Sequence, residues 1–345
     1  MDFPKKAGVN KKIMNKVILS LTIIFLVSCS AVRQMQVNVP KPILVQLPAD
    51  IKRIVIVDKT QGNVLTGIEG VLTGEMIGVD KILSQECIAG LTNPFLNYSG
   101  LQVTRHTERL KSEHKSSLGF GTTMPWSQVE EIAQINNADA LFVLEYFDSD
   151  FTVRDVTSPN NIGTVMFRGY AKASVGVRVY LPKTRSLFYE NNFTYSSFYG
   201  ETAVSKALLL AKLTYGTNVL KNASYELGNR IGKRFVSYKT WEDRVIFKGK
   251  KSVPQKAERL ILAQDYEGAI TILEKAFSVE TDQKIKAAIA HNLGYCYEIN
   301  GDLQQSKKWL SESFVISGNG KTQSYLTIIN RRIEEDYILE IQSKK

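Results

Sequence analysis

Two stretches near the carboxyl terminus share one spacing of small, aromatic and leucine residues. The first has Ala257, Leu260, Tyr266, Ala269, Leu273, Ala276 and Phe277, and the second has Gly294, Tyr297, Leu303, Ser306, Leu310, Ser313 and Phe314, each 37 positions after its counterpart. A repeat of this length indicates a pair of helices that must stack on a neighbouring pair to bury its apolar face. The spacing therefore predicts an all-helical repeat region beginning near residue 253.

The pattern resembles the tetratricopeptide repeat, a helix-turn-helix unit of about 34 residues. The resemblance implies two repeats over residues 253–318, followed over residues 319–345 by a capping helix or a degenerate third repeat. It also implies packing roles, because small residues let paired helices approach closely and large residues fill the space between them. The residues with these roles are Ala257, Leu260, Tyr266, Ala269, Leu293, Gly294, Tyr297 and Leu310.

The first 28 residues have the layout of an export signal. Five lysines precede an apolar run from Val17 to Ser28. This run is shorter than the roughly 20 apolar residues that span a bilayer and has the length of a signal-peptide core. It ends in Leu26, Val27, Ser28 and Cys29, which resembles the bacterial lipobox. The resemblance implies that residues 1–28 are removed and that Cys29 carries lipid.

Lipid on Cys29 makes a membrane the first expected partner. Each buried methylene contributes about 0.8 kcal/mol, and several acyl chains on one residue anchor durably where a single chain does not. Ser30 follows the cysteine, in place of the aspartate that commonly retains lipoproteins in the inner membrane of enteric bacteria. We therefore expect a lipoprotein of the cell envelope, at the outer membrane and facing the periplasm.

Residues 29–50 have the composition of a tether between this anchor and the folded chain. Pro40, Pro42 and Pro48 disfavour a helix and stiffen the segment. Such a spacer would lift the folded part of the protein off the membrane.

Residues 51–248 predict an α/β domain. Short apolar runs indicate buried strands, apolar residues at helical spacing indicate helices, and two alternating stretches around a polar turn indicate an antiparallel hairpin. The expected elements are strands at 53–58, 101–104 and 140–144, helices at 79–91 and 126–136, a hairpin of 165–181 with 187–198, a helical stretch at 202–236 and an edge strand at 245–247.

This order resembles a periplasmic α/β fold shared by curli-secretion lipoproteins, the amino-terminal domain of TolB and lipoprotein activators of penicillin-binding proteins. The resemblance lies in the strand Arg53–Asp58, the segment Ala138–Leu144 and the turn Pro182–Arg185. The whole layout also resembles a family of uncharacterised Bacteroidota lipoproteins. It implies the α+β class, a mixed sheet with packed helices, followed by an all-α region of tetratricopeptide-like repeats, and it implies no known activity.

Charge and cysteine content restrict the classes of partner. The formal net charge is +10, of which the signal contributes +4 from five lysines and one aspartate, so the mature chain carries +6. No basic run interleaved with aromatic residues indicates a nucleic-acid groove. Cys87 and Cys296 fall in different predicted domains. A disulfide between them would have to meet strict geometry, so we expect two buried free thiols.

The sequence shows no motif for a catalytic, cofactor or metal site. The segment Gly318–Thr322 resembles the end of a phosphate-binding loop, but Val315 stands where the first glycine belongs, which favours a helix stop. The glycine-rich stretch 61–78 lacks the dinucleotide-binding spacing, and a surface loop is favoured over an anion site. The three histidines show no zinc-ligand spacing. We therefore expect no cofactor and no metal.

These observations favour a non-enzymatic interaction module in envelope assembly or maintenance, with protein partners bound by the helical repeats. Two alternatives stay open. The α/β domain could form a homo-oligomeric component of a secretion assembly, or the chain could be an envelope hydrolase whose site follows no recognised motif.

Overall fold

The structure is a computed structural model that describes residues 31–60, 79–110, 119–157, 166–205, 217–249 and 251–344. The chain divides into two compact units. One contains Pro40–Thr240 with Ile338–Lys345 and is called the sheet unit below. The other contains Met1–Val39 with Trp241–Tyr337 and is called the helical unit.

The sheet unit is built on a five-stranded mixed sheet in the order β3-β2-β4-β5-β6. Strand β2 (Arg53–Asp58) lies between β3 (Gln102–Arg105) and β4 (Ala140–Asp155) and is parallel to both. Strand β5 (Phe167–Leu181) pairs antiparallel with β4, and β6 (Ser186–Ala203) pairs antiparallel with β5, as the alternating sequence pattern predicts. The predicted mixed sheet with packed helices is confirmed.

The turn between β5 and β6 is a single 3-10 turn, η1 (Pro182–Thr184). Proline fits its first position because the pyrrolidine ring fixes φ near the value that the turn needs. Arg185 then adopts a left-handed conformation with φ 48°, which closes the hairpin at the predicted tetrapeptide.

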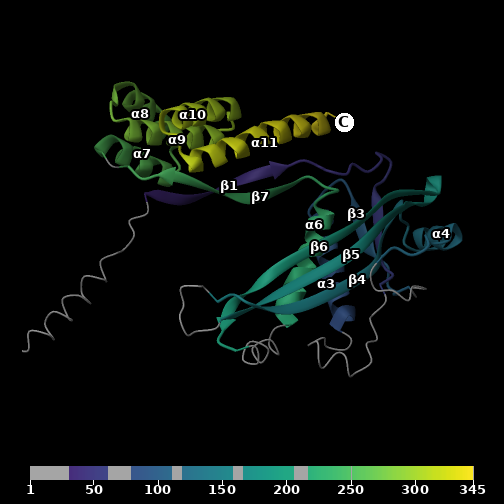
Figure 1. Cartoon of the computed structure of the whole chain (residues 1–345). Coiled ribbons are helices and arrows are strands. Elements are labelled where there is room, and N and C mark those ends of the chain that lie inside the picture. Colours follow the sequence, from purple (N-terminus) through teal and green to yellow (C-terminus); the bar gives the residue numbers. More distant parts are fainter. Residues whose placement is uncertain are drawn as a thin grey trace, which may run out of the picture. The chain divides into compact units, whose positions relative to one another are not determined.

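Helices α3 (Val79–Leu96) and α6 (Thr217–Gly232) cover one face of the sheet and share its larger core (Figure 1). Two glycines let their backbones touch. A Cβ on Gly90 would lie 1.9 Å from the carbonyl oxygen of Tyr225, and one on Gly228 would lie 1.9 Å from that of Cys87. The opposite face is covered by α4 (Trp126–Ile135), which packs Val129 and Ile132 on β2 and β4.

Residues 32–41 correct the tether prediction. Val32–Lys41 forms strand β1, which pairs with β7 (Tyr238–Phe247) in a separate two-stranded sheet, so 10 of the 22 residues of the predicted spacer are regular structure. The predicted edge strand at 245–247 therefore belongs to this ribbon and not to the five-stranded sheet. Proline at residue 40 is compatible with β1 because a strand in a two-stranded ribbon has one side that needs no ladder hydrogen bond.

The carboxyl-terminal region is all helical, as predicted. Three of its helices begin at an aspartate whose side chain accepts a hydrogen bond from a backbone N–H of the first turn: Asp265, Asp282 and Asp302. The helices are α7 (Ser252–Leu262), α8 (Tyr266–Val279), α9 (Gln283–Ile299), α10 (Leu303–Ser317) and α11 (Gly320–Ser343).

Two stretches differ from the sequence expectation. Strand β4 extends to Asp155, far beyond the apolar run Ala140–Leu144, because its distal half pairs with β5 through polar and partly buried residues that carry no apolar signal. The predicted helical stretch at 202–236 begins too early, since β6 continues to Ala203 and α6 starts at Thr217.

Candidate functional site

The β1–β7 ribbon contacts the first helix of each successive helix pair (Figure 1). Arg33 on β1 forms an ion pair of 2.9 Å with Glu258 on α7. Glu242 on β7 forms one of 3.3 Å with Arg331 on α11. Together with the contacts to α9 described next, these place the chain's own ribbon on the face built from α7, α9 and α11, which we call the first-helix face. Where these contacts lie, the chain's own ribbon occupies that face, and the expectation that protein partners bind the helical repeats stays a prediction.

Helix α9 holds β7 by its backbone. The Asn292 carboxamide donates to the carbonyl oxygen of Phe247 and accepts from the N–H of the same residue, both at 2.8 Å. Nε2 of His291 lies 2.9 Å from the carbonyl oxygen of Val245, and Nδ1 lies 2.9 Å from the Thr322 hydroxyl. Side-chain groups thus replace the ladder that a third strand would supply to β7.

Burial decides the protonation state of His291. Removal from water lowers its pKa to about 4, although the Val245 carbonyl acts in the opposite direction. The ring is therefore neutral near pH 7. Since the carbonyl can only accept, Nε2 carries the hydrogen and the Thr322 hydroxyl donates to Nδ1.

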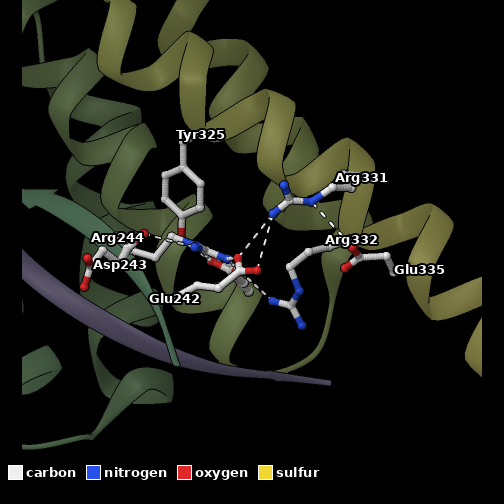
Figure 2. A network of polar contacts seen from close by, with 8 residues as sticks. Glu242, Asp243, Arg244, Tyr325, Arg331, Arg332 and Glu335 are labelled. Carbon is white, nitrogen blue, oxygen red and sulfur yellow. Dashed lines mark hydrogen bonds and ion pairs between the residues drawn. The ribbon is translucent and has the colours of Figure 1, made fainter. Parts of the chain in front are cut away.

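A buried ion network ties β7 to α9 and α11 (Figure 2). Its centre is Glu298, whose side chain is 0% exposed and which pairs with Arg244, 1% exposed, at 2.8 Å. Arg332 also pairs with Glu298, and the Tyr325 hydroxyl donates to it. A second carboxylate, Glu242, binds Arg244 at 3.0 Å.

The pKa shifts in this network indicate a structural role. Although burial alone would lower the pKa of Arg244, the hydrogen bond and charge of Glu298 raise it above its ordinary value. Burial, followed by the charge of Glu298, raises the pKa of Tyr325 well above its ordinary value. Both groups therefore keep their protons at any physiological pH, and neither can serve as a general base.

A cavity of about 390 Å³ lies beside this ribbon in the helical unit. This volume falls within the roughly 300–1,000 Å³ of small-molecule sites. Its wall comes from the ends of β7 and α10, the first turn of α7 and the amino-terminal half of α9, and Ala31 at the start of β1 also lines it. The lining is mainly apolar, including Phe247, Pro254, Ile285 and Ile289.

A second polar cluster lies at the carboxyl end of β2 in the sheet unit. In parallel sheets, ligands commonly bind at the carboxyl ends of the strands. The favoured place is where two neighbouring strands have their crossover connections on opposite faces of the sheet. Asp58 accepts from Gln85 at 2.6 Å, from Arg109 at 2.9 Å and from the Thr60 hydroxyl at 2.7 Å. Its oxygens are thus already occupied by the protein, so the cluster fastens β2 to α3 and to the chain after β3.

The neighbouring carboxylate, Glu145, is paired as well. It binds Lys59 at 2.9 Å and Arg178 at 3.4 Å, and the Tyr180 hydroxyl donates to it at 3.0 Å. Burial raises the pKa of Tyr180 to about 12, with the charge of Glu145 acting in the same direction. In the described parts of the chain, no group of acidic, histidine or cysteine side chains is arranged to hold a metal ion.

The Ala138–Leu144 segment has a structural explanation. Its Asp139 accepts from the N–H groups of Lys52 and Arg53 at 3.0 and 2.9 Å and pairs with the Arg53 guanidinium at 2.6 Å. The hydrogen bond from Arg53 holds the pKa of Asp139 at about 2. This aspartate holds the start of β2 against the start of β4, so the role of the motif is structural.

Strand β6 forms one end of the sheet, and among the described residues no strand pairs with its outer side. From Ser186 to Phe198 it contains no lysine, arginine or proline. Its one charged residue there, Glu190, is bound by Arg178 at 2.6 Å. Natural sheets usually protect an edge with such residues, so a long edge without them is suited to pairing with another strand.

The residues to which the sequence assigns packing roles lie in the helical core. Four are fully buried, Ala257, Ala269, Leu293 and Leu310, and three are partly buried, Leu260, Tyr266 and Tyr297. A Cβ on Gly294 would lie 2.5 Å from Cγ of Leu310, so this glycine sits where α9 and α10 touch.

The other candidate residues divide into two groups. The lipobox Leu26–Ser28, the lipidation site Cys29 and the glycine-rich stretch 61–78 lie outside the described residues. Gly318 ends α10 with a left-handed φ of 60°, which confirms a helix stop in place of a phosphate loop. Cys87 and Cys296 are both free and buried, as predicted.

Sequence reasoning missed Asn292, His291, Arg244 and Glu298. Asn292, His291 and Glu298 lie inside a segment with the pattern of a repeat helix, and Arg244 directly precedes the predicted edge strand at 245–247. The one sequence signal for these contacts was a polar residue at a helix position expected to be buried. Such a residue does not indicate to which strand its side chain is hydrogen-bonded.

Residues 51–247 match a family described as a domain of unknown function, DUF8603, over more than half of the chain. The chain belongs to the DUF8603 family. Residues 255–341 of this DUF8603 chain also match a second domain of unknown function, DUF6340. No curated protein matches it in sequence.

Solved structures similar to this DUF8603 chain are distant. A neuraminyllactose-binding hemagglutinin homolog from Helicobacter pylori is 10% identical, with 55% of this chain and 86% of that chain covered and a TM-score of 0.31. The PelC dodecamer from Paraburkholderia phytofirmans is 12% identical, with coverage of 59% and 97% and a TM-score of 0.24. Lipoprotein GNA1162 from Neisseria meningitidis is 14% identical, with coverage of 48% and 95% and a TM-score of 0.19. Of the helices described here, none is long and apolar enough to cross a membrane.

Proposed function

We propose that this chain is a lipoprotein of the outer membrane, facing the periplasm, and that it works as a non-enzymatic interaction module in envelope assembly or maintenance. The lipobox ending at Cys29 supports the location. The absence of a catalytic role is supported by the described buried carboxylates Asp58, Glu145 and Glu298, each of which already binds a cationic side chain.

The observation that carries the interaction role is the outer edge of β6. Because the ribbon β1–β7 covers much of the first-helix face, the repeats are no longer the favoured partner surface. Strand β6 is 18 residues long and has the exposed Phe198, 59% accessible, near its end. An extended segment of a partner protein that adds to this edge would gain main-chain hydrogen bonds along the strand and contacts with alternate side chains.

The test is photocrosslinking in living cells from Asn191, an exposed position of β6, with partners identified by mass spectrometry. The exposed Gln304 on α10 is the control position. We expect a heterologous envelope protein to be captured from Asn191 and not from Gln304. A second chain with the crosslinker at Asn191 and the substitution Ser196→Lys should lose the product, because a lysine on an edge strand disfavours strand addition.

The alternative, an oligomeric component of a secretion assembly, uses the same edge. Crosslinks from Asn191 to a second copy alone would favour this alternative and overturn the scaffold proposal. Absence of any specific product from Asn191 would remove the edge as a partner surface.

A further inference from the structure

We propose that the cavity beside β7 holds one acyl chain of the lipid that the same molecule carries on Cys29. The inference rests on the proposed lipid anchor. It concerns only the helical unit, since every residue lining the cavity belongs to that unit.

The cavity offers an incoming molecule apolar surface and few free polar groups. Both groups of the Asn292 carboxamide are bound by Phe247, and the Ser313 hydroxyl donates to the carbonyl oxygen of Ala287 at 2.8 Å. The Asn319 side chain accepts from the N–H of Lys321, and Asp282 accepts from the first turn of α9. A polar ligand would find these particular atoms already bonded, whereas a hydrocarbon chain gains from the apolar lining and needs none of them.

Charge at the rim fits the head of such a molecule. Lys284 is exposed and Lys248 is partly exposed, and both line the cavity. Their ammonium groups can remain in water or contact polar ester oxygens while the chain lies inside. The Asp282 carboxylate also lines the cavity, so two lysines and one carboxylate give the lining a net positive charge, which suits the polar head of an amphiphile.

The position of the cavity identifies the source of the chain. Ala31 lines it, and Cys29 is two residues earlier, so at most about 7 Å of backbone separates the lipidated residue from the rim. A ligand tethered this closely is present at a high effective concentration, which favours it over free lipid of the same chemistry. The remaining acyl chains would still anchor the protein.

The experiment uses the full lipidated chain from cells fed a fatty acid that carries a diazirine. After irradiation and digestion, we expect the Cys29 peptide to be joined to the peptide that contains Ile285–Asn292 or to the end of α10. Ala288→Phe fills the cavity from α9 and should abolish this product. The matched control is Ala263→Phe, because Ala263 is exposed and does not line the cavity.

A second variant tests whether loss of the product results from a change in the cavity and not from misfolding. Ile285→Glu places a charge in the lining, but an acidic side chain in the first turn of α9 favours the helix, so the fold should persist. Loss of the product in both variants, with retention in Ala263→Phe, supports the proposal. A product formed equally in all chains overturns it.

Failure of the pocket and failure of the anchor are distinguishable. The mass of the Cys29 peptide reports lipidation directly, and an unmodified Cys29 would overturn the proposed anchor together with the pocket's occupant. A lipidated Cys29 without the crosslinked product overturns the pocket alone. Labelled phospholipid on the α9 peptide, in place of the Cys29 peptide, would assign the cavity to bulk lipid and overturn the tethered source.

Discussion

The side chain of Asn292 on α9 pairs with the backbone of Phe247 on β7 through two hydrogen bonds of 2.8 Å each. Asn292 lies in a helix that the repeat pattern predicts. The strand to which it is hydrogen-bonded is not predicted by that pattern. Through this pair a stack of helices holds an extended ribbon of its own chain, much as a peptide would be held.

Replacing Asn292 with alanine leaves the partly buried N–H and carbonyl of Phe247 without these partners. An unsatisfied buried polar group costs about 1–3 kcal/mol, so Asn292→Ala should lower the free energy of unfolding by about 2 kcal/mol or more. Urea unfolding followed by circular dichroism measures this. Gln304→Ala, at an exposed helix position, should stay within about 0.5 kcal/mol of the parent, and an equal loss in both variants would contradict the role of the pair.

Substituting Glu298 with glutamine should cost more than any surface change. The carboxylate balances Arg244 and Arg332, and breaking a buried pair by removing one partner typically costs about 3–5 kcal/mol. The same unfolding measurement checks this, with Glu334→Gln as the exposed control. If Glu298→Gln unfolded at the urea concentration of the parent, the network would be dispensable for stability.

The pKa of His291, about 4, predicts loss of stability in mild acid. In the unfolded chain the ring has a pKa near its ordinary 6.5, so between these values the unfolded state binds the additional proton. Stability contributed by the neutral ring is complete above pH 6.5 and declines as the pH falls towards 4, by about 3 kcal/mol in all. Melting temperatures between pH 7.5 and 4.5 measure it. The variant His291→Gln should have a flatter profile over this range, and an unchanged slope would contradict the assignment.

Adding a methyl group at Gly294 should separate α9 from α10. The new Cβ would lie 2.5 Å from Leu310, and overpacking of this kind costs about 1–3 kcal/mol. Gly320→Ala is the matched control, because a Cβ there meets no atom within 4 Å. Thermal unfolding should separate the two variants, and Leu310→Val in the Gly294→Ala background should recover part of the loss.

The two buried cysteines should resist alkylation in the folded chain. Burial raises the pKa of Cys296 to about 12, and burial followed by the charge of Asp58 raises that of Cys87 still further. The thiolate is the reactive form of cysteine. Iodoacetamide at pH 8 should therefore modify neither residue in the folded chain and both residues in about 6 M urea. Peptide mass spectrometry gives the result, and rapid labelling of Cys296 in the folded state would show that α9 opens.

Much of the architecture can be predicted from local sequence. The repeat spacing places helices at α7 to α10, because packing between paired helices imposes a residue-by-residue requirement for small and large side chains. The apolar runs place β2 and the start of β4, since strands buried on both faces need no polar residue. The candidate site is different, because Asn292, His291, Arg244 and Glu298 form hydrogen bonds with residues 27 to 54 positions away in the chain.

By itself the sequence determined the lipobox at Cys29 as the expected anchor, the mixed α+β class and the helical carboxyl-terminal region. Only the tertiary structure decided that Val32–Lys41 is a strand, that it pairs with β7, and that this ribbon contacts the first-helix face. The physical reason is range. Helix and turn signals arise from neighbours within a few residues, whereas a two-stranded ribbon joining residues 32–41 to 238–247 depends on hydrogen bonds with a third element, the polar side chains of α9, that no local pattern records.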